Sequence, residues 1–173
     1  MKKTIVLFIT TALLASCEAS KEDLITRRWQ AVALESPMIE GQMQQLKEFI
    51  DTVGTTTDAV TNEALYGVAN MDSMRQQMRL QFDTILNDHK EAVHNTWLDF
   101  REDGSVVASF GAEPDTVAWY FEEDGTLMLD EMKLKGTGSK NRMKVNKLDK
   151  DSLRLEFKEN EITSTAVFIP TGK

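Results

Sequence analysis

The sequence predicts a mainly β protein, an eight-stranded antiparallel up-and-down β-barrel with a two- or three-helix insertion after the first strand. Three observations lead to this prediction. An alternating apolar pattern at residues 28–34 predicts a first strand. Residues 38–95 carry apolar side chains every three or four positions, which is typical of amphipathic helices. Beyond Asn95 the period falls to two, and short strands joined by tight turns favour a closed meander over a sandwich.

Seven further strands are expected after the helical insertion. They are predicted at residues 96–101, 105–110, 116–122, 126–130, 142–148, 153–157 and 162–169. Asp103-Gly104 and Asp124-Gly125 stand between the first two pairs, and Asp-Gly is a strong hairpin signal because both residues tolerate a positive φ angle. Gly136-Thr137-Gly138 predicts a flexible hairpin loop.

Two apolar stripes define the helices of the insertion. The first contains Ile39, Met43, Leu46, Ile50 and Val53, at intervals of four, three, four and three residues, and Gly54 ends it. The second runs from Val60 to Val93, with a break predicted near Gly67 or Asn70. Since so narrow a helical block is not stable alone, it is expected to pack as a hairpin or to lie across another part of the protein. The side chains expected to be buried against the other helix and an opening of the barrel are Met74, Met78, Phe82 and Ile85.

The first 16 residues have the pattern of a lipoprotein signal peptide. Two lysines precede an apolar run of about ten residues, which is too short to span a bilayer of roughly 30 Å. The segment Leu14-Ala15-Ser16-Cys17 resembles the lipobox of bacterial lipoproteins, and Cys17 is the only cysteine. This resemblance implies that Cys17 becomes the first mature residue and carries fatty acyl chains such as palmitate, which anchor the domain stably. The alternative is a plain signal peptide with an incidental cysteine.

Residues 17–27 are expected to form a tether and a short helix. Lys21-Glu22-Asp23 resembles the surface-export signal of lipoproteins in the Bacteroidota, whereas Ser20 with Asp23 is close to a capping box that would begin a helix. The two interpretations are compatible. The expected location is therefore the outer membrane, at its periplasmic or its cell-surface face.

The strand segments resemble the lipocalin-like lipoprotein domains that are common in the Bacteroidota. The segments that carry this resemblance are 28–30 (Arg-Trp-Gln), 97–106, 119–127, 145–148 (Val-Asn-Lys-Leu) and 153–155. The resemblance implies a barrel domain at residues 28–173, interrupted by the insertion at 38–95, and a binding or scaffolding role. It brings no catalytic residues.

Charge excludes one class of partner. The chain has 20 Lys and Arg against 28 Asp and Glu, a formal net charge of -8, and its surface should repel nucleic acid. Six basic residues with no acid between them follow one another at Lys133, Lys135, Lys140, Arg142, Lys144 and Lys147. They suit lipid phosphates or an anionic ligand, or alternatively the solvated faces of edge strands; we favour the second interpretation.

The sequence predicts neither a catalytic site nor a metal site. His89 and His94 are five residues apart, about 140° around a helix, so they cannot share a metal as residues four apart can. No Gly-x-Ser-x-Gly elbow is present, and Cys17 is committed to acylation. The clustered carboxylates fall at hairpin turns rather than in apolar pockets, where general acids are found. We expect a protein that is not an enzyme and has no cofactor.

The predicted function is the binding of a small apolar or amphipathic ligand. The side chains expected to line its site are Trp119, Phe121, Leu127 and Phe157 in the barrel, with Met74 and Met78 in the helices. The alternative is an interaction or scaffold module that docks an envelope protein through the Met-rich helical face. An open cavity of a few hundred Å³ would favour the first function, and a solid interior the second.

Overall fold

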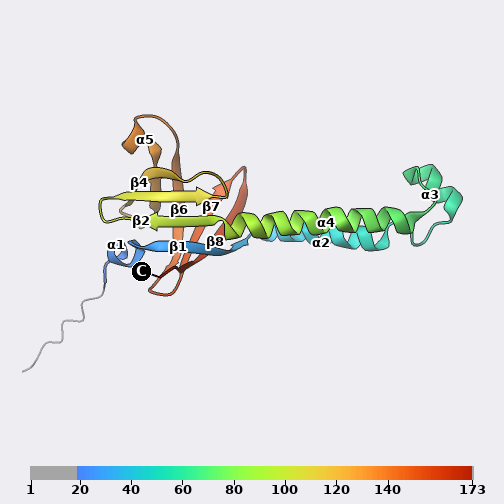
Figure 1. Ribbon diagram of the computed structural model, residues 1–173, viewed down its shortest axis with the longest axis horizontal. Helices are drawn as coiled ribbons and strands as arrows, with labels where there is room; N and C mark the ends of the chain where they lie inside the picture. The colour runs from blue at the N-terminus through green and yellow to red at the C-terminus, as the bar shows by residue number, and fades with distance from the viewer. Residues whose placement is uncertain (1–18, 173) are drawn as a thin grey trace, which may run out of the picture.

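Eight strands close into one barrel in the computed structural model, which describes residues 19–172 (Figure 1). The strands are β1 (Arg28–Glu35), β2 (Thr96–Phe100), β3 (Ser105–Phe110), β4 (Asp115–Phe121), β5 (Leu127–Asp130), β6 (Lys140–Leu148), β7 (Leu153–Glu159) and β8 (Ile162–Pro170). Each strand is antiparallel to its neighbours, the spatial order follows the chain order, and β8 closes the ring on β1. The predicted up-and-down barrel with a helical insertion after its first strand is confirmed.

The Asp-Gly hairpins form as predicted, and the Asp and the Gly contribute to each turn in different ways. Gly104 alone takes a left-handed conformation, with φ of +78°. The Oδ1 atom of Asp103 accepts a hydrogen bond from the backbone N–H of Ser105 at 2.8 Å, which fixes the turn from the side chain. Residues 124–126 repeat this arrangement between β4 and β5.

A short helix, α1 (Lys21–Ile25), closes one end of the barrel. Its predicted capping box is present, since the side chains of Ser20 and Asp23 each accept a hydrogen bond from the backbone N–H of the other residue. Ile25 is completely buried, and its carbonyl accepts a hydrogen bond from Nε1 of the buried Trp29 at 2.9 Å. This end of the barrel is therefore filled with side chains.

The helical insertion projects from the opposite end of the barrel as an arm, defined here as residues 37–95 (Figure 1). It consists of α2 (Pro37–Thr52), α3 (Ala59–Tyr66) at the tip and α4 (Met71–His94), which returns to the barrel. The predicted break is confirmed: Gly67, with φ of +72°, ends α3, and the side chain of Asn70 caps α4. At 1.5 Å per residue α4 is about 36 Å long.

The expectation that Met74, Met78, Phe82 and Ile85 are buried against an opening of the barrel is wrong. Ile85 is 50% exposed, and Met74, Met78 and Phe82 are only half-buried. The reason lies in the connections. The arm begins directly after β1 and ends directly before β2, which are paired neighbours, so the helical hairpin leaves the barrel as a continuation of this strand pair.

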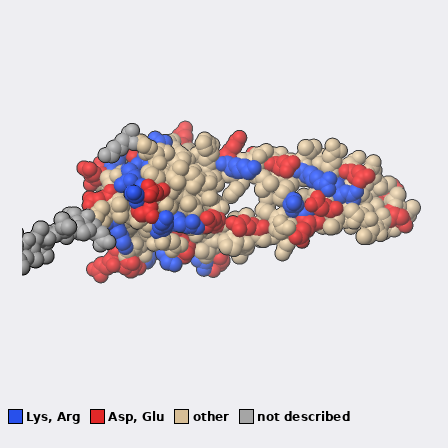
Figure 2. Space-filling model, turned by 90° about the horizontal axis from the view of Figure 1, so that it is seen from below, with Lys and Arg blue, Asp and Glu red and all other residues tan. Residues whose placement is uncertain are grey.

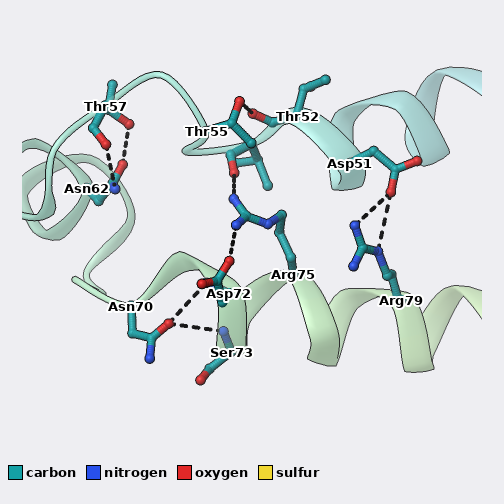
Figure 3. A network of polar contacts seen from close by, with 11 residues as sticks. Asp51, Thr52, Thr55, Thr57, Asn62, Asn70, Asp72, Ser73, Arg75 and Arg79 are labelled. Carbon is teal, nitrogen blue, oxygen red and sulfur yellow. Dashed lines mark hydrogen bonds and ion pairs between the residues drawn. The ribbon is translucent and has the colours of Figure 1, made fainter.

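Polar contacts join the helices in the half of the arm nearer its tip. In the half nearer the barrel, a hollow separates α2 from α4 (Figure 2). Arg75 is central to these contacts (Figure 3). Its Nη1 atom donates a hydrogen bond to the carbonyl of Val53 at 2.7 Å, and its other guanidinium nitrogen pairs with Asp72. Arg79 pairs with Asp51 at 2.9 Å, which sets these two residues opposite one another on α4 and α2.

One element, α5 (Glu131–Lys135), was not predicted. Asp130 caps its first turn by accepting a hydrogen bond from the N–H of Lys133 at 2.9 Å, and Gly136 ends it with φ of +76°. The signal was an Asp followed six residues later by a Gly. A helix of five residues is too short to show an apolar period.

Candidate functional site

A cavity of about 340 Å³ opens at the end of the barrel that carries the arm. The apolar side chains on its wall are Ala31, Ala33, Leu34, Ala92, Val93, Leu98, Phe110, Met143, Leu155, Phe157, Ala166 and Phe168. All of them come from the strands except Ala92 and Val93, which lie at the root of α4. The arm therefore contributes one side of the cavity mouth.

Alanine creates this space. Three alanines line it, Ala31 and Ala33 on β1 and Ala166 on the neighbouring strand β8, and their side chains are too small to fill the interior of the barrel. At the other end, by contrast, the Trp119 ring packs edge-on against Phe100, with ring centroids 5.4 Å apart. Small residues at one end and aromatic rings at the other leave one end of the barrel open and the other packed.

The six residues predicted to line a ligand site do not come together. Phe157 lies on the cavity wall. Trp119 and Phe121 pack on one another, with centroids 6.0 Å apart, at the end covered by α1, and Leu127 is completely buried there beside Phe121. Met74 and Met78 lie in the arm, away from the barrel. The cavity-lining alanines were overlooked because sequence reasoning looked for large side chains.

The polar groups of the cavity are few. Thr96, His89 and Glu159 are the polar residues on its wall, and the last two are exposed. Such a site buries an apolar body and leaves polar groups near the mouth for the polar end of an amphipathic molecule. Within residues 19–172 no three His, Cys, Asp or Glu side chains gather as a metal site would require.

The basic stretch at residues 133–147 does not form a free anion site. Five of its six cations pair with carboxylates: Lys135 with Asp115, Lys140 with Asp130, Arg142 with Glu122 and Asp124, Lys144 with Glu156, and Lys147 with Asp149. The sixth, Lys133, has its Nζ atom 4.6 Å from the centroid of the Tyr120 ring. All six cations are exposed to solvent, as expected, but none lies on an edge strand, because the barrel is closed and β6 pairs with both β5 and β7. Figure 2 shows cations and carboxylates interspersed over the barrel.

Asp130 is the most buried of these carboxylates, with 2% of its side chain exposed. The Nζ atom of Lys140 lies 2.9 Å away, and this partner, together with the N–H of Lys133 and the hydroxyl of Tyr120, holds the pKa of Asp130 below its ordinary value. Asp130 in turn raises the pKa of Lys140. The charged pair ties β5 to β6 and caps α5.

We expect acid to destabilise the fold through such carboxylates. A carboxyl whose pKa is lower in the folded state contributes stability above roughly pH 4, and this is lost as the pH falls through the folded-state pKa. Asp130→Asn should lower the melting temperature at pH 7 and reduce the further drop between pH 7 and pH 3. Asp88→Asn, at an exposed position on α4, is the matched control. An acid-induced drop that is the same in Asp130→Asn and wild type would contradict this role.

Three comparisons, with protein-family models, with curated proteins and with solved structures, find no match to this chain. Among the described residues no helix is both long and apolar enough to cross a membrane. The predicted signal peptide at residues 1–16 and the predicted lipid attachment site at Cys17 lie outside the described residues. The fold and the cavity define the molecule as a closed β-barrel with one open, apolar end.

Proposed function

We propose that this protein is a lipid-anchored lipoprotein of the outer membrane whose barrel binds a small apolar or amphipathic molecule. One observation carries the proposal: the barrel holds an apolar cavity of about 340 Å³ at its open end. This volume lies within the range of roughly 300 to 1,000 Å³ that is usual for small-molecule sites. The site offers burial and no reactive constellation, so the role is binding rather than catalysis.

The position of the cavity suits a tethered binder. Cys17 stands four residues before α1, and α1 closes the end of the barrel opposite the cavity (Figure 1). A lipid anchor at Cys17 would thus hold the packed end near the membrane, and the cavity and the arm would face away from it. The resemblance of Leu14-Ala15-Ser16-Cys17 to a lipobox supports the anchor, and the resemblance of the strand segments to lipocalin-like lipoproteins supports a binding role.

The alternative function, docking of an envelope protein through the Met-rich helical face, has one supporting observation. The arm extends into solvent and leaves large apolar side chains exposed along it. Of the methionines in the arm, Met38 is 50% exposed, Met43, Met74 and Met78 are half-buried, and Met71 is buried. Contact through the arm and binding in the barrel are compatible functions.

The ligand proposal is tested with a fluorescent fatty acid, 11-(dansylamino)undecanoic acid. We expect saturable binding of one probe per chain to the full-length protein in detergent, at micromolar concentration. Ala166→Phe places a ring in the cavity and should weaken binding at least tenfold, and Ala33→Phe should do the same from the neighbouring strand. Ala64→Phe adds the same ring at an exposed position on α3 and serves as the matched control.

Thermal melting of each variant shows whether it remains folded. Folded Ala166→Phe and Ala33→Phe variants that bind the probe as tightly as wild type would contradict the proposal, as would a wild-type protein that shows no saturable binding.

A further inference from the structure

The arm has two unlike faces, and the ion pair between Asp51 and Arg79 identifies them. Because these side chains meet at 2.9 Å, the sides of α2 and α4 that carry them belong to one face of the arm. At 100° per residue, the other charged side chains within about 60° of these two are Glu40, Lys47 and Glu48 in α2 and Asp72, Arg75, Asp83 and Lys90 in α4. We name this the charged arm face.

The opposite face is apolar. Roughly 100–160° around each helix from Asp51 and Arg79 lie Ile39, Leu46 and Phe49 in α2 and Met74, Met78 and Ile85 in α4, which together form the apolar arm face. Phe49 is 48% exposed and Ile85 50% exposed. Of the charged residues in these helices only Asp88 borders this face, near the barrel. Side chains so large and so exposed lack the burial that normally stabilises a helical hairpin.

The apolar side chains form one continuous strip. The two helices are antiparallel, so a step towards the barrel lowers the residue number in α2 and raises it in α4. Counted from the Asp51–Arg79 pair, Leu46 and Ile85 therefore lie at the same level along the arm. Phe49 lies between them and the tip. Measured along the arm from the level of Ile39 to the level of Met74, the strip is about 25 Å long.

We propose that the apolar arm face is an interface with a second copy of this chain, in which two arms pack into a four-helix bundle. Charge restricts the contact between two copies to the apolar arm face. Residues 37–95 carry nine Asp and Glu against four Lys and Arg, so two arms repel through most of their surface. Two apolar arm faces, however, meet with uncharged side chains at the centre, which is the composition of homodimer interfaces.

The geometry also fits a second copy. Two helices side by side, each about 10 Å across, present enough surface over about 25 Å for two copies to bury on the order of 1,000 Å² in total, the lower limit for a stable interface. A two-fold axis along the arm would place α2 of one copy against α4 of the other, so that all neighbouring helices run antiparallel, as in up-and-down bundles. The interface does not involve the barrel cavity, so it stands or falls independently of ligand binding.

The test measures the number of chains in the full-length protein in detergent, by light scattering with the detergent contribution subtracted. We expect a dimer. Phe49→Glu combined with Leu46→Glu should yield a monomer with unchanged helix content, because both side chains are already exposed. Leu80→Glu replaces a residue that is 62% exposed on the other side of α4, and this matched control should remain dimeric.

A second measurement applies in intact membranes. Leu46→Cys and Ile85→Cys in the same chain should form disulfide-linked dimers on mild oxidation, because α2 of one copy lies against α4 of the other, and Leu80→Cys should not. A wild-type chain that is monomeric at all concentrations would overturn the proposal and leave the face to a different protein. A dimer that survives the two glutamates, or one that cross-links equally through residue 80, would overturn it as well.

Discussion

Trp29→Ala is expected to lower the free energy of unfolding by about 3 to 5 kcal/mol, the largest effect on stability that we predict for a single substitution. Trp29 is completely buried in the barrel core. Alanine removes the indole ring and also the hydrogen bond from Nε1 to the carbonyl of Ile25. The loss is a large fraction of the roughly 5 to 15 kcal/mol that stabilises a typical domain. Urea unfolding of the purified protein measures it.

Trp97→Ala is the matched control for this substitution. Trp97 is half-buried on the neighbouring strand β2, and the guanidinium of Arg28 lies 4.0 Å from the centroid of its ring. Its loss should cost about 1 kcal/mol, since an exposed cation–π contact contributes roughly 0.5 to 1 kcal/mol. Equal destabilisation by the two substitutions would show that the packed end of the barrel does not depend on Trp29.

Cys17→Ala is expected to abolish attachment to the outer membrane. The thiol is the proposed site of acylation, and two or more acyl chains give stable anchoring where a single chain gives only marginal binding. Membrane fractionation with immunoblotting should show the wild type in the outer membrane fraction and the variant as unprocessed or released protein. Mass spectrometry of the wild type should find no peptide from residues 1–16 and a diacyl or triacyl mass on Cys17.

Ser20→Ala controls for changes near the anchor that leave the cysteine intact. It removes the side-chain cap of α1 but should not change attachment. If the Cys17→Ala chain were processed and remained in the membrane fraction, the anchor proposal would fail, while ligand binding in the barrel would be unaffected.

Local signals were sufficient to predict the strands. β3 has the predicted bounds, and the ends of the other strands lie within two residues of those predicted. Alternation of apolar and polar residues and the Asp-Gly turns act between residues close in the chain, so they are legible in a single sequence. The break before α4 could be predicted for the same reason, because Gly67 and Asn70 end and cap helices through conformations and hydrogen bonds within a few residues of the chain.

Local signals could not predict which surface covers the apolar stripes of the arm. An apolar stripe identifies the side of a helix that avoids water, but it does not name the surface that covers it. Met74, Met78, Phe82 and Ile85 were correctly placed on one stripe, yet whether they met the barrel depended on the direction in which the chain left β1. The pairing of β1 with β2 decided that direction, and it joins residues more than 60 positions apart.

The sequence by itself determined which residues form strands, where the chain turns and that Trp119, Leu127 and Phe157 lie on strands of the barrel. Only the tertiary structure decided which of these side chains lie at the same height along the barrel axis. Trp119, Leu127 and Phe157 all belong to the barrel interior or pack against it, but closure of β8 on β1 places the first two beneath α1 and the third at the cavity. The level of a side chain in a closed barrel depends on the stagger of all eight strands, which no single segment encodes.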